Sequence, residues 1–172
     1  QEGEKYILPG VGSFDEGMNN LKKTGIYEVI NHEVLVNKKP VLGICLGMQL
    51  LSNSSQEGHE KGLCWLDAET IKFNFNDLNE SKQPLPVPHM GWNIITSQNK
   101  SDLMSGLESE NRFYFVHSYH VNCKNSENIV ATSHYGFKFV CAVNKDNIYG
   151  VQFHPEKSHK FGMRLLKNFS DI

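Results

Sequence analysis

The sequence predicts an α/β fold, an open mixed and mainly parallel sheet flanked by helices, with an antiparallel C-terminal portion. Three observations lead to this prediction. Two short apolar runs near the N-terminus are separated by a segment with helical spacing, as in a parallel strand-helix-strand unit. The second half holds several β-rich runs joined by turn-like residues. An amphipathic segment then closes the chain. A length of 172 residues with 39% hydrophobic residues is enough for one domain, residues 1–172.

The N-terminal elements follow one another with short links. A buried strand is expected first, then a glycine turn, a helical region, a second strand after Pro40 and a further helix. These are Lys5–Pro9, Gly10-Val11-Gly12, Phe14–Val36, Val41–Cys45 and Leu46–Leu51. Strands linked in this way form a right-handed parallel unit.

The second half begins after a polar connector. Residues 74–88 are rich in Asn, Asp, Ser, Lys and Gln, contain three prolines and have no apolar period, so an exposed loop is expected. The expected strands are Trp92–Thr96, Arg112–Val121, Ile129–His134, Phe137–Val143 and Tyr149–His154. Ser158 is the expected N-cap of a closing helix whose apolar stripe is Phe161, Leu165, Leu166 and Phe169.

Composition excludes several functional classes. The formal charge of −2 is nearly balanced and no stripe of Lys and Arg would follow a phosphate backbone, so nucleic-acid binding has no support. No run approaches the apolar length of a membrane span, and the N-terminus lacks a signal-peptide pattern, so we expect no membrane association and a cytoplasmic location. The four irregularly spaced cysteines are expected to be free thiols, Cys45, Cys64, Cys123 and Cys141. We expect no metal and no cofactor.

The segment GICLG carries a candidate nucleophile. A buried strand delivers Cys45 to a tight strand-to-helix turn between Gly43 and Gly47, an arrangement similar to a nucleophile elbow. A helix N-terminus there would lower the pKa of the thiol. The alternative is that Cys45 is a small core residue, because free cysteine is among the most buried residue types. A catalytic thiol also needs a base.

His154 is the candidate base. It follows a β-rich run, and Pro155 stops the strand there, while Glu156 lies two residues further on and would orient the imidazole. A rival interpretation groups His117, His120 and His154 as metal ligands. Residues three apart on one strand point to opposite faces, so we give that metal site little weight.

The glycine turn supplies the third component. Gly10, Val11 and Gly12 directly follow the first strand, where their backbone N–H groups can turn toward a developing oxyanion. The N–H of Leu46, the residue after the nucleophile, would complete this oxyanion hole. Taken alone, such a segment is usually just a tight turn.

Three ordered motifs, LPGVGSF, GICLGMQLL and GVQFHPE, closely resemble the class I glutamine amidotransferases over essentially the whole chain. The resemblance implies a flavodoxin-like fold and a catalytic triad of Cys45, His154 and Glu156. The same architecture hosts peptidase-like and chaperone-like relatives with a cysteine elbow, but the sequence HPE after a strand argues against those.

Further motifs, PHMGWN, YFVHSYH and PEKS, are similar to one branch, the glutaminase subunits of imidazole glycerol phosphate synthases. The resemblance implies glutamine as substrate, its amino-acid end held by Gln49 and Glu57 with backbone from Ser118 and Tyr119. It also implies a heterodimer with a (βα)8-barrel cyclase subunit, which receives the ammonia and makes imidazole glycerol phosphate and AICAR in histidine biosynthesis. The residues implied to face that partner are Pro88, His89, Met90, Gly91, Trp92, Asn93 and Lys157.

Three points stay open at this level. Members of this branch have a strand and a helix upstream of LPGVGSF, so we expect the glutaminase domain here to lack its first strand and helix. Paralogues that read PEKSHKFG, as this chain does, supply ammonia for amidination of bacterial surface sugars, which is an alternative acceptor pathway. A non-catalytic interaction subunit is a weaker alternative, because all three triad residues are present.

Overall fold

The computed structural model describes residues 3–75, 85–107 and 111–172. Their strands are β1 (Tyr6–Gly10), β2 (Val41–Cys45), β3 (Ser54–Ser55), β4 (Ala68–Lys72), β5 (His89–Ser97), β6 (Arg112–His117), β7 (Tyr119–Cys123), β8 (Ile129–Tyr135), β9 (Phe137–Lys145) and β10 (Ile148–Val151). Their helices are α1 (Phe14–Lys23), α2 (Ile26–Asn31), α3 (Leu46–Leu50) and α4 (His159–Asp171), with a π-helical turn at His32–Val36 and 3-10 turns at Asp102–Met104, Ser126–Asn128 and Pro155–Lys157.

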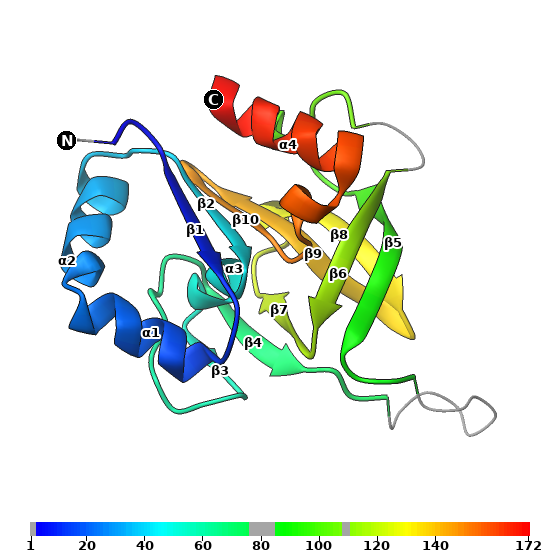
Figure 1. The fold of residues 1–172 in the computed structure, drawn as a ribbon, viewed down its shortest axis with the longest axis horizontal. Coiled ribbons are helices and arrows are strands. Elements are labelled where there is room, and N and C mark those ends of the chain that lie inside the picture. The colour runs from blue at the N-terminus through cyan, green and yellow to red at the C-terminus, as the bar shows by residue number, and fades with distance from the viewer. Residues whose placement is uncertain (1–2, 76–84, 108–110) are drawn as a thin grey trace.

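The strands form one mixed sheet with a branch (Figure 1). Its main path is β1-β2-β10-β9-β7-β4-β3, and β8 joins β9 to β5, which pairs in turn with β6. Strands β1 and β10 both pair in parallel with β2, while β9 pairs antiparallel with β10. The predicted α/β class, with a parallel start and an antiparallel second half, is therefore confirmed.

Two apolar clusters lie on opposite faces of the parallel strands. On one face, Phe14 and Met18 of α1 pack with the side chains of α3 and with Val41, a group that we call the α1-side cluster. On the other face, Leu165 and Phe169 of α4 form the α4-side cluster with residues of β2 and β10. All five residues of β2 are buried, as expected for a strand covered on both faces.

The predicted helix over residues 14–36 is broken, so the prediction of one continuous helix was wrong. Gly25 has φ 72°, in the left-handed region, and ends α1 with its N–H bonded to the Lys22 carbonyl. The chain then restarts as α2 and continues into the π-helical turn. Met18, Ile30 and Val34 are all buried, which is why the apolar period continues across the break.

The predicted strand Arg112–Val121 is two strands that separate at Ser118. Strand β6 pairs with β5, whereas β7 pairs with β4 and β9, and the Ser118 carbonyl accepts a bond of 3.1 Å from the Phe73 N–H. An apolar run does not record which partner strand each half joins. Residues 74, 75 and 85–88 of the expected loop have no helix or strand, and the rest of it lies outside the described residues.

The strand predicted at Tyr149–His154 ends earlier, at Val151. The chain then leaves β2, and the His154 N–H bonds to the Tyr114 carbonyl of β6 at 2.9 Å in an isolated bridge. Ser158 stands at the N-cap position of α4 but does not cap it, which corrects the prediction. Its hydroxyl donates to the His154 carbonyl (2.6 Å) and accepts from the Tyr114 N–H (3.0 Å).

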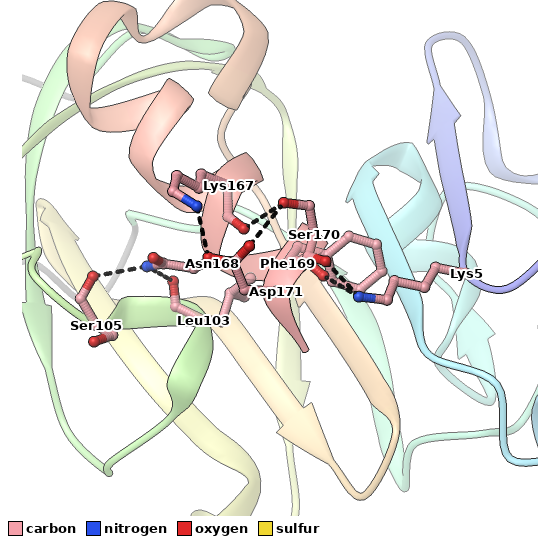
Figure 2. A network of polar contacts seen from close by, with 8 residues as sticks. All are labelled: Lys5, Leu103, Ser105, Lys167, Asn168, Phe169, Ser170 and Asp171. Atoms are coloured by element: carbon pink, nitrogen blue, oxygen red, sulfur yellow. Dashed lines mark hydrogen bonds and ion pairs between the residues drawn. The ribbon is translucent and has the colours of Figure 1, made fainter.

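Helix α4 docks as its apolar stripe predicts, and polar contacts fix its far end (Figure 2). Asn168 donates from Nδ2 to the carbonyls of Leu103 (2.9 Å) and Ser105 (2.7 Å), and Lys5 Nζ donates to the Ser170 carbonyl at 2.5 Å. These bonds tie the last helix to the 3-10 turn before β6 and to the chain just before β1. The helix in turn holds the segment that carries His154.

Candidate active site

Cys45 occupies a strained turn between β2 and α3. Its backbone has φ 55° and ψ −111°, a conformation that residues other than glycine rarely adopt. The preceding strand is buried on both faces and the following helix starts at once, so the chain has no room for a wider turn. The geometry is that of a nucleophile elbow.

The two glycines around Cys45 permit close packing of backbone on backbone. A Cβ on Gly47 would lie 1.7 Å from the Leu8 carbonyl oxygen, and a Cβ on Gly43 would lie 2.7 Å from the Gly47 carbonyl oxygen. Both distances are far too short for a side chain. The glycines therefore bring α3 down onto β1 and β2, and this packing forces the sharp turn at the cysteine.

The thiol opens into a pocket of about 320 Å³, within the usual range of small-ligand sites. Most of the residues predicted for the site line it: Val11, Gly12, Cys45, Leu46, Gln49, Glu57, Pro88, Ser118, Tyr119, His154 and Lys157. Two further lining residues, Val116 and His117, were not predicted for this site. Gly10 does not line the pocket, because it is the last residue of β1 and lies opposite Cys45 in the parallel ladder.

His154 lines the pocket and forms a hydrogen-bonded pair with Glu156, which is not among the lining residues. The imidazole is only 3% exposed and its Nδ1 lies 2.7 Å from Glu156 Oε1, whereas the glutamate side chain is half exposed. The other ring nitrogen, Nε2, is buried and has no hydrogen-bond partner in the described part of the chain. A carboxylate on Nδ1 selects the tautomer that carries its proton there, so Nε2 is free to accept one.

The Cys45 thiol is largely shielded from water, since the residue is 8% exposed. Burial raises its pKa to about 11, although the Leu46 backbone N–H and, more weakly, the positive charge of Lys157 act in the opposite direction. The expectation that a helix N-terminus would favour the thiolate was wrong here. Helix α3 has only five residues, and its first N–H does not offset the loss of water around the sulfur.

The predicted oxyanion turn lies beside the thiol. Val11 is 82% exposed, and Gly12 has φ 104°, which glycine adopts without strain. The Leu46 backbone N–H lies against the Cys45 sulfur and acts to lower the pKa of the thiol. Two sources of backbone N–H groups, the turn after β1 and the start of α3, therefore border the same pocket.

The residues implied to hold substrate are already engaged with the protein. Glu57 Oε2 accepts a 2.8 Å bond from the Phe14 N–H and so ties the pocket wall to the start of α1. Gln49 is 5% exposed and donates from Nε2 to the Tyr119 carbonyl at 3.2 Å. Ser118 contributes its carbonyl to the bond with the Phe73 N–H.

The implied partner face divides into two sides. Met90, Trp92 and Ile94 project outward from β5 and are 62%, 47% and 49% exposed. His89 is buried on the inner side, so its side chain is not part of that exposed face, and Asn93 is half-buried. Gly91 lies between them with φ 129°. Pro88 and Lys157 join this face to the pocket, with Lys157 Nζ 5.9 Å from the Tyr114 ring centre.

The metal interpretation has no geometric support among the described residues, since no three His, Cys, Asp or Glu side chains gather there in a way that could hold an ion. The argument used against it was nevertheless wrong. His117 and His120 lie on different strands and both contact the Phe73 ring, at 5.2 and 4.9 Å between ring centres. In the described part of the chain, no helix is long and apolar enough to cross a membrane.

Fold and site together define an α/β protein with a cysteine at a nucleophile elbow and a histidine-carboxylate pair beside it. The pattern of one family, glutamine amidotransferase class-I, matches residues 5–172. The chain belongs to this family and is a glutamine amidotransferase subunit.

Two relatives carry the name imidazole glycerol phosphate synthase subunit HisH 2. The one from Methanococcus maripaludis is 55% identical over 165 residues, which are 96% of this chain and 79% of the relative. The one from Pseudomonas aeruginosa is 47% identical over 172 residues, which are 100% of this chain and 82% of the relative. At this similarity the chain groups with the HisH subunits.

Solved structures show the same fold at lower identity. A glutamine amidotransferase from Thermotoga maritima has a TM-score of 0.62 at 18% identity, covering 96% of this chain and 61% of its own. The glutaminase domain of Trypanosoma brucei CTPS, solved with acivicin, has a TM-score of 0.60 at 19% identity and covers 98% and 71%.

Proposed function

We propose that this chain hydrolyses glutamine to glutamate and ammonia with Cys45 as nucleophile, His154 as base and acid, and Glu156 as the group that orients the imidazole. One observation carries the proposal. The buried Nε2 of His154 has no hydrogen-bond partner among the described residues, and His154 lines the same pocket as Cys45, while Nδ1 is held by the carboxylate. A thiol and an imidazole nitrogen that is open to accept its proton are what such a pair needs.

In the first half of the reaction, the Cys45 sulfur bonds to the side-chain carbonyl carbon of glutamine while its proton moves to His154 Nε2. Because the pKa of the free thiol is about 11, the thiolate does not accumulate beforehand, and proton transfer accompanies attack. The carbonyl oxygen becomes an oxyanion, which backbone N–H groups of Leu46 and of the turn at Val11 and Gly12 stabilise. The imidazolium then protonates the departing nitrogen, and ammonia leaves a thioester.

In the second half, water attacks the thioester carbon. His154 takes a proton from the water and returns it to the sulfur as the carbon–sulfur bond breaks, so glutamine and water give glutamate and ammonia. Glu156 is proposed to orient the imidazole and to stabilise the imidazolium in both halves. Gln49, Glu57 and the backbone of Ser118 and Tyr119 are proposed to hold the amino-acid end of the substrate.

The ammonia is proposed to pass to a (βα)8-barrel cyclase subunit in a heterodimer, through a channel that excludes bulk water. The exposed apolar side chains of β5, with Pro88 and Lys157 at the edge of the pocket, are the surface proposed to meet it. The names of the relatives support the proposal that this ammonia is used to make imidazole glycerol phosphate and AICAR in histidine biosynthesis. We also propose that the protein is cytoplasmic and that the assembled enzyme has lyase activity.

A Cys45→Ala variant tests the mechanism. We expect glutamine hydrolysis to fall at least a thousandfold, because no other described group in the pocket can form the thioester. The measurement is glutamate release by the full-length protein together with the partner that copurifies with it. Cys64→Ala, which removes an exposed thiol outside the pocket, is the matched control and should keep the parent rate. Hydrolysis that survives the loss of Cys45 would refute the proposal.

The acceptor has one competing candidate. Two relatives are numbered HisH 2, so their names distinguish more than one such subunit, and the chain reads PEKSHKFG as surface-sugar paralogues do. Identification of the copurifying subunit separates the pathways. A barrel that closes an imidazole ring with ammonia from glutamine supports histidine biosynthesis, whereas a sugar amidotransferase supports the surface polysaccharide pathway.

A further inference from the structure

A continuous line of hydrogen bonds leads from the inner side of β5 to the nucleophile. Asn93 Nδ2 lies 3.2 Å from His89 Nε2, and His89 Nδ1 lies 3.0 Å from His117 Nε2. His117 Nδ1 lies 2.7 Å from the Tyr119 carbonyl oxygen. We call His89 and His117 the histidine pair. Neither residue belongs to the triad, and His89 does not line the pocket.

The line continues through two glutamine side chains, Gln49 and Gln152, which we call the glutamine pair. Gln49 Nε2 donates to the same Tyr119 carbonyl at 3.2 Å and to Gln152 Oε1 at 3.1 Å. Gln152 is fully buried, and its Nε2 donates to the Cys45 sulfur at 3.8 Å. The Tyr119 carbonyl therefore accepts a hydrogen bond from each pair and links the histidine pair to the glutamine pair.

The direction of every bond follows from its neighbour. A carbonyl only accepts, so His117 carries its proton on Nδ1 and accepts on Nε2 from the Nδ1–H of His89. His89 Nε2 must then accept from the Asn93 amide. The orientation of that amide is fixed independently, because Asn93 Oδ1 accepts from the Ile94 N–H at 2.8 Å and Nδ2 also donates to the His134 carbonyl at 2.9 Å. Every hydrogen bond between Asn93, His89, His117 and the Tyr119 carbonyl therefore joins one donor to one acceptor.

The histidine pair is neutral and rigidly packed, as this arrangement requires. Burial lowers the pKa of His89 to about 4 and that of His117 to about 3, so neither carries a charge at neutral pH. The His89 ring stacks on Tyr135 and Phe115, at 4.1 and 4.9 Å between ring centres. A second proton on either ring would place two N–H groups against each other.

We propose that His89 and His117 are positioning residues of the glutaminase reaction. They fix the Tyr119 carbonyl, and the glutamine pair carries that constraint to the Cys45 thiol, which keeps the sulfur aimed into the pocket. The proposal rests on the proposed function for its kinetic consequence, but the orientation of the thiol can be measured without glutamine.

The test is a set of variants in the full-length protein with its copurifying partner. His117→Phe removes both bonds but keeps a ring, and we expect kcat to fall about tenfold, the size of effect expected when one hydrogen bond is lost. His117→Asn places an amide nitrogen near Nδ1, keeps the bond to Tyr119 and should stay within threefold of the parent. His120→Phe is the matched control, since the His120 ring contacts the same Phe73 ring but its nitrogens form no hydrogen bond among the described residues, and its kcat should not change.

A double variant gives the sharpest outcome. Gln152→Met removes the last link without touching the aromatic residues, and should lower kcat as His117→Phe does. Combined with His117→Phe it should cause no further loss, because both break one line. Losses that multiply, or a His117→Asn variant as slow as His117→Phe, would overturn the proposal and leave the ring a packing role only.

A second readout separates this proposal from the glutaminase mechanism. The rate at which iodoacetamide alkylates Cys45, followed by mass spectrometry of its peptide, reports on the thiol with no substrate present. We expect His117→Phe and Gln152→Met to slow alkylation at pH 8 severalfold, and His117→Asn and His120→Phe to leave it unchanged. Equal rates in all variants would refute the positioning role even if Cys45→Ala abolishes glutamine hydrolysis.

Discussion

The nucleophile and the base are held by different parts of the molecule in different ways. Backbone packing fixes the main chain of Cys45, at a strained φ of 55° between a buried strand and a helix pressed against it at two glycines. Hydrogen bonds position His154, which follows the end of β10: Glu156 holds its ring, and its backbone N–H forms the bridge to Tyr114. The first arrangement tolerates almost no added volume, whereas the second depends on particular polar atoms.

The difference teaches where substitutions act. A substitution in the cysteine turn should lower the stability of the fold as well as the activity, because the contacts that pack the backbone there are also the contacts that set the geometry of the nucleophile. A change around the histidine should cost chemistry and leave the fold nearly intact, because the imidazole is fixed by bonds that the core does not need.

Gly47→Ala should have the largest effect. A Cβ would lie 1.7 Å from the Leu8 carbonyl oxygen, backbone against backbone, so α3 has to move off β1. We expect a loss of at least about 4 kcal/mol of unfolding free energy, measured by urea denaturation. Gly25→Ala is the control. Its Cβ meets nothing within 4 Å, and only its left-handed φ should cost about 1 kcal/mol. Equal losses in the two variants would show that the turn is not tightly packed.

Glu156→Gln should leave stability nearly unchanged and lower kcat about a hundredfold, the size of a typical acid-base contribution. The neutral amide still reaches His154 Nδ1 but no longer stabilises the imidazolium. Steady-state glutamate release measures the effect. Glu60→Gln, which breaks only the surface ion pair with Lys22, should stay within twofold of the parent. If the Glu156→Gln variant kept half of the parent rate, the negative charge of the carboxylate would have no important role in the mechanism.

His120→Phe should have the smallest effect, and a favourable one. His120 is 6% exposed and neither of its ring nitrogens has a hydrogen-bond partner among the residues that the structure describes, while its ring lies 5.5 Å from that of Phe137. Replacing two unsatisfied polar atoms with an apolar ring should add about 1 kcal/mol at pH 7, measured by urea denaturation.

The same variant has a pH signature. Burial lowers the pKa of folded His120 to about 4, and unfolded histidine titrates near 6.5, so the unfolded chain binds the extra proton between these values. The parent therefore loses stability as pH falls from 6.5 toward 4, and the advantage of His120→Phe should grow by about 1 kcal/mol per pH unit in that range. The exposed His134→Phe is the control. An advantage that does not change between pH 7 and 5 would contradict this account.

Sequence reasoning reached the local features well. The strand-to-helix turn at Cys45 is encoded by neighbouring residues, and the parallel unit around it was confirmed. Residues from motifs far apart in the sequence also line one pocket, as expected from the resemblance: Val11, Gly12, Cys45, Leu46, Gln49, His154 and Lys157. The roles of those residues stay proposals.

What the sequence did not reveal depends on contacts between distant segments. The break at Ser118 arises because β6 and β7 join different partners, and no period in the sequence marks such a switch. The raised pKa of Cys45 depends on burial, which residues far along the chain complete. His89 and His117 meet across the β5-β6 ladder, 28 positions apart, and neither position carries a local signal for that contact.

The high pKa of Cys45 also bears on how the protein survives oxidants. Peroxides oxidise the thiolate, so a thiol that stays protonated and is 8% exposed reacts slowly with them until substrate draws its proton away. Cys64, exposed at the surface, is the thiol that oxidants meet first. The sulfur of such a resting enzyme is protected from oxidation. Oxidative damage to the active site is therefore confined to the short time when substrate makes the sulfur reactive.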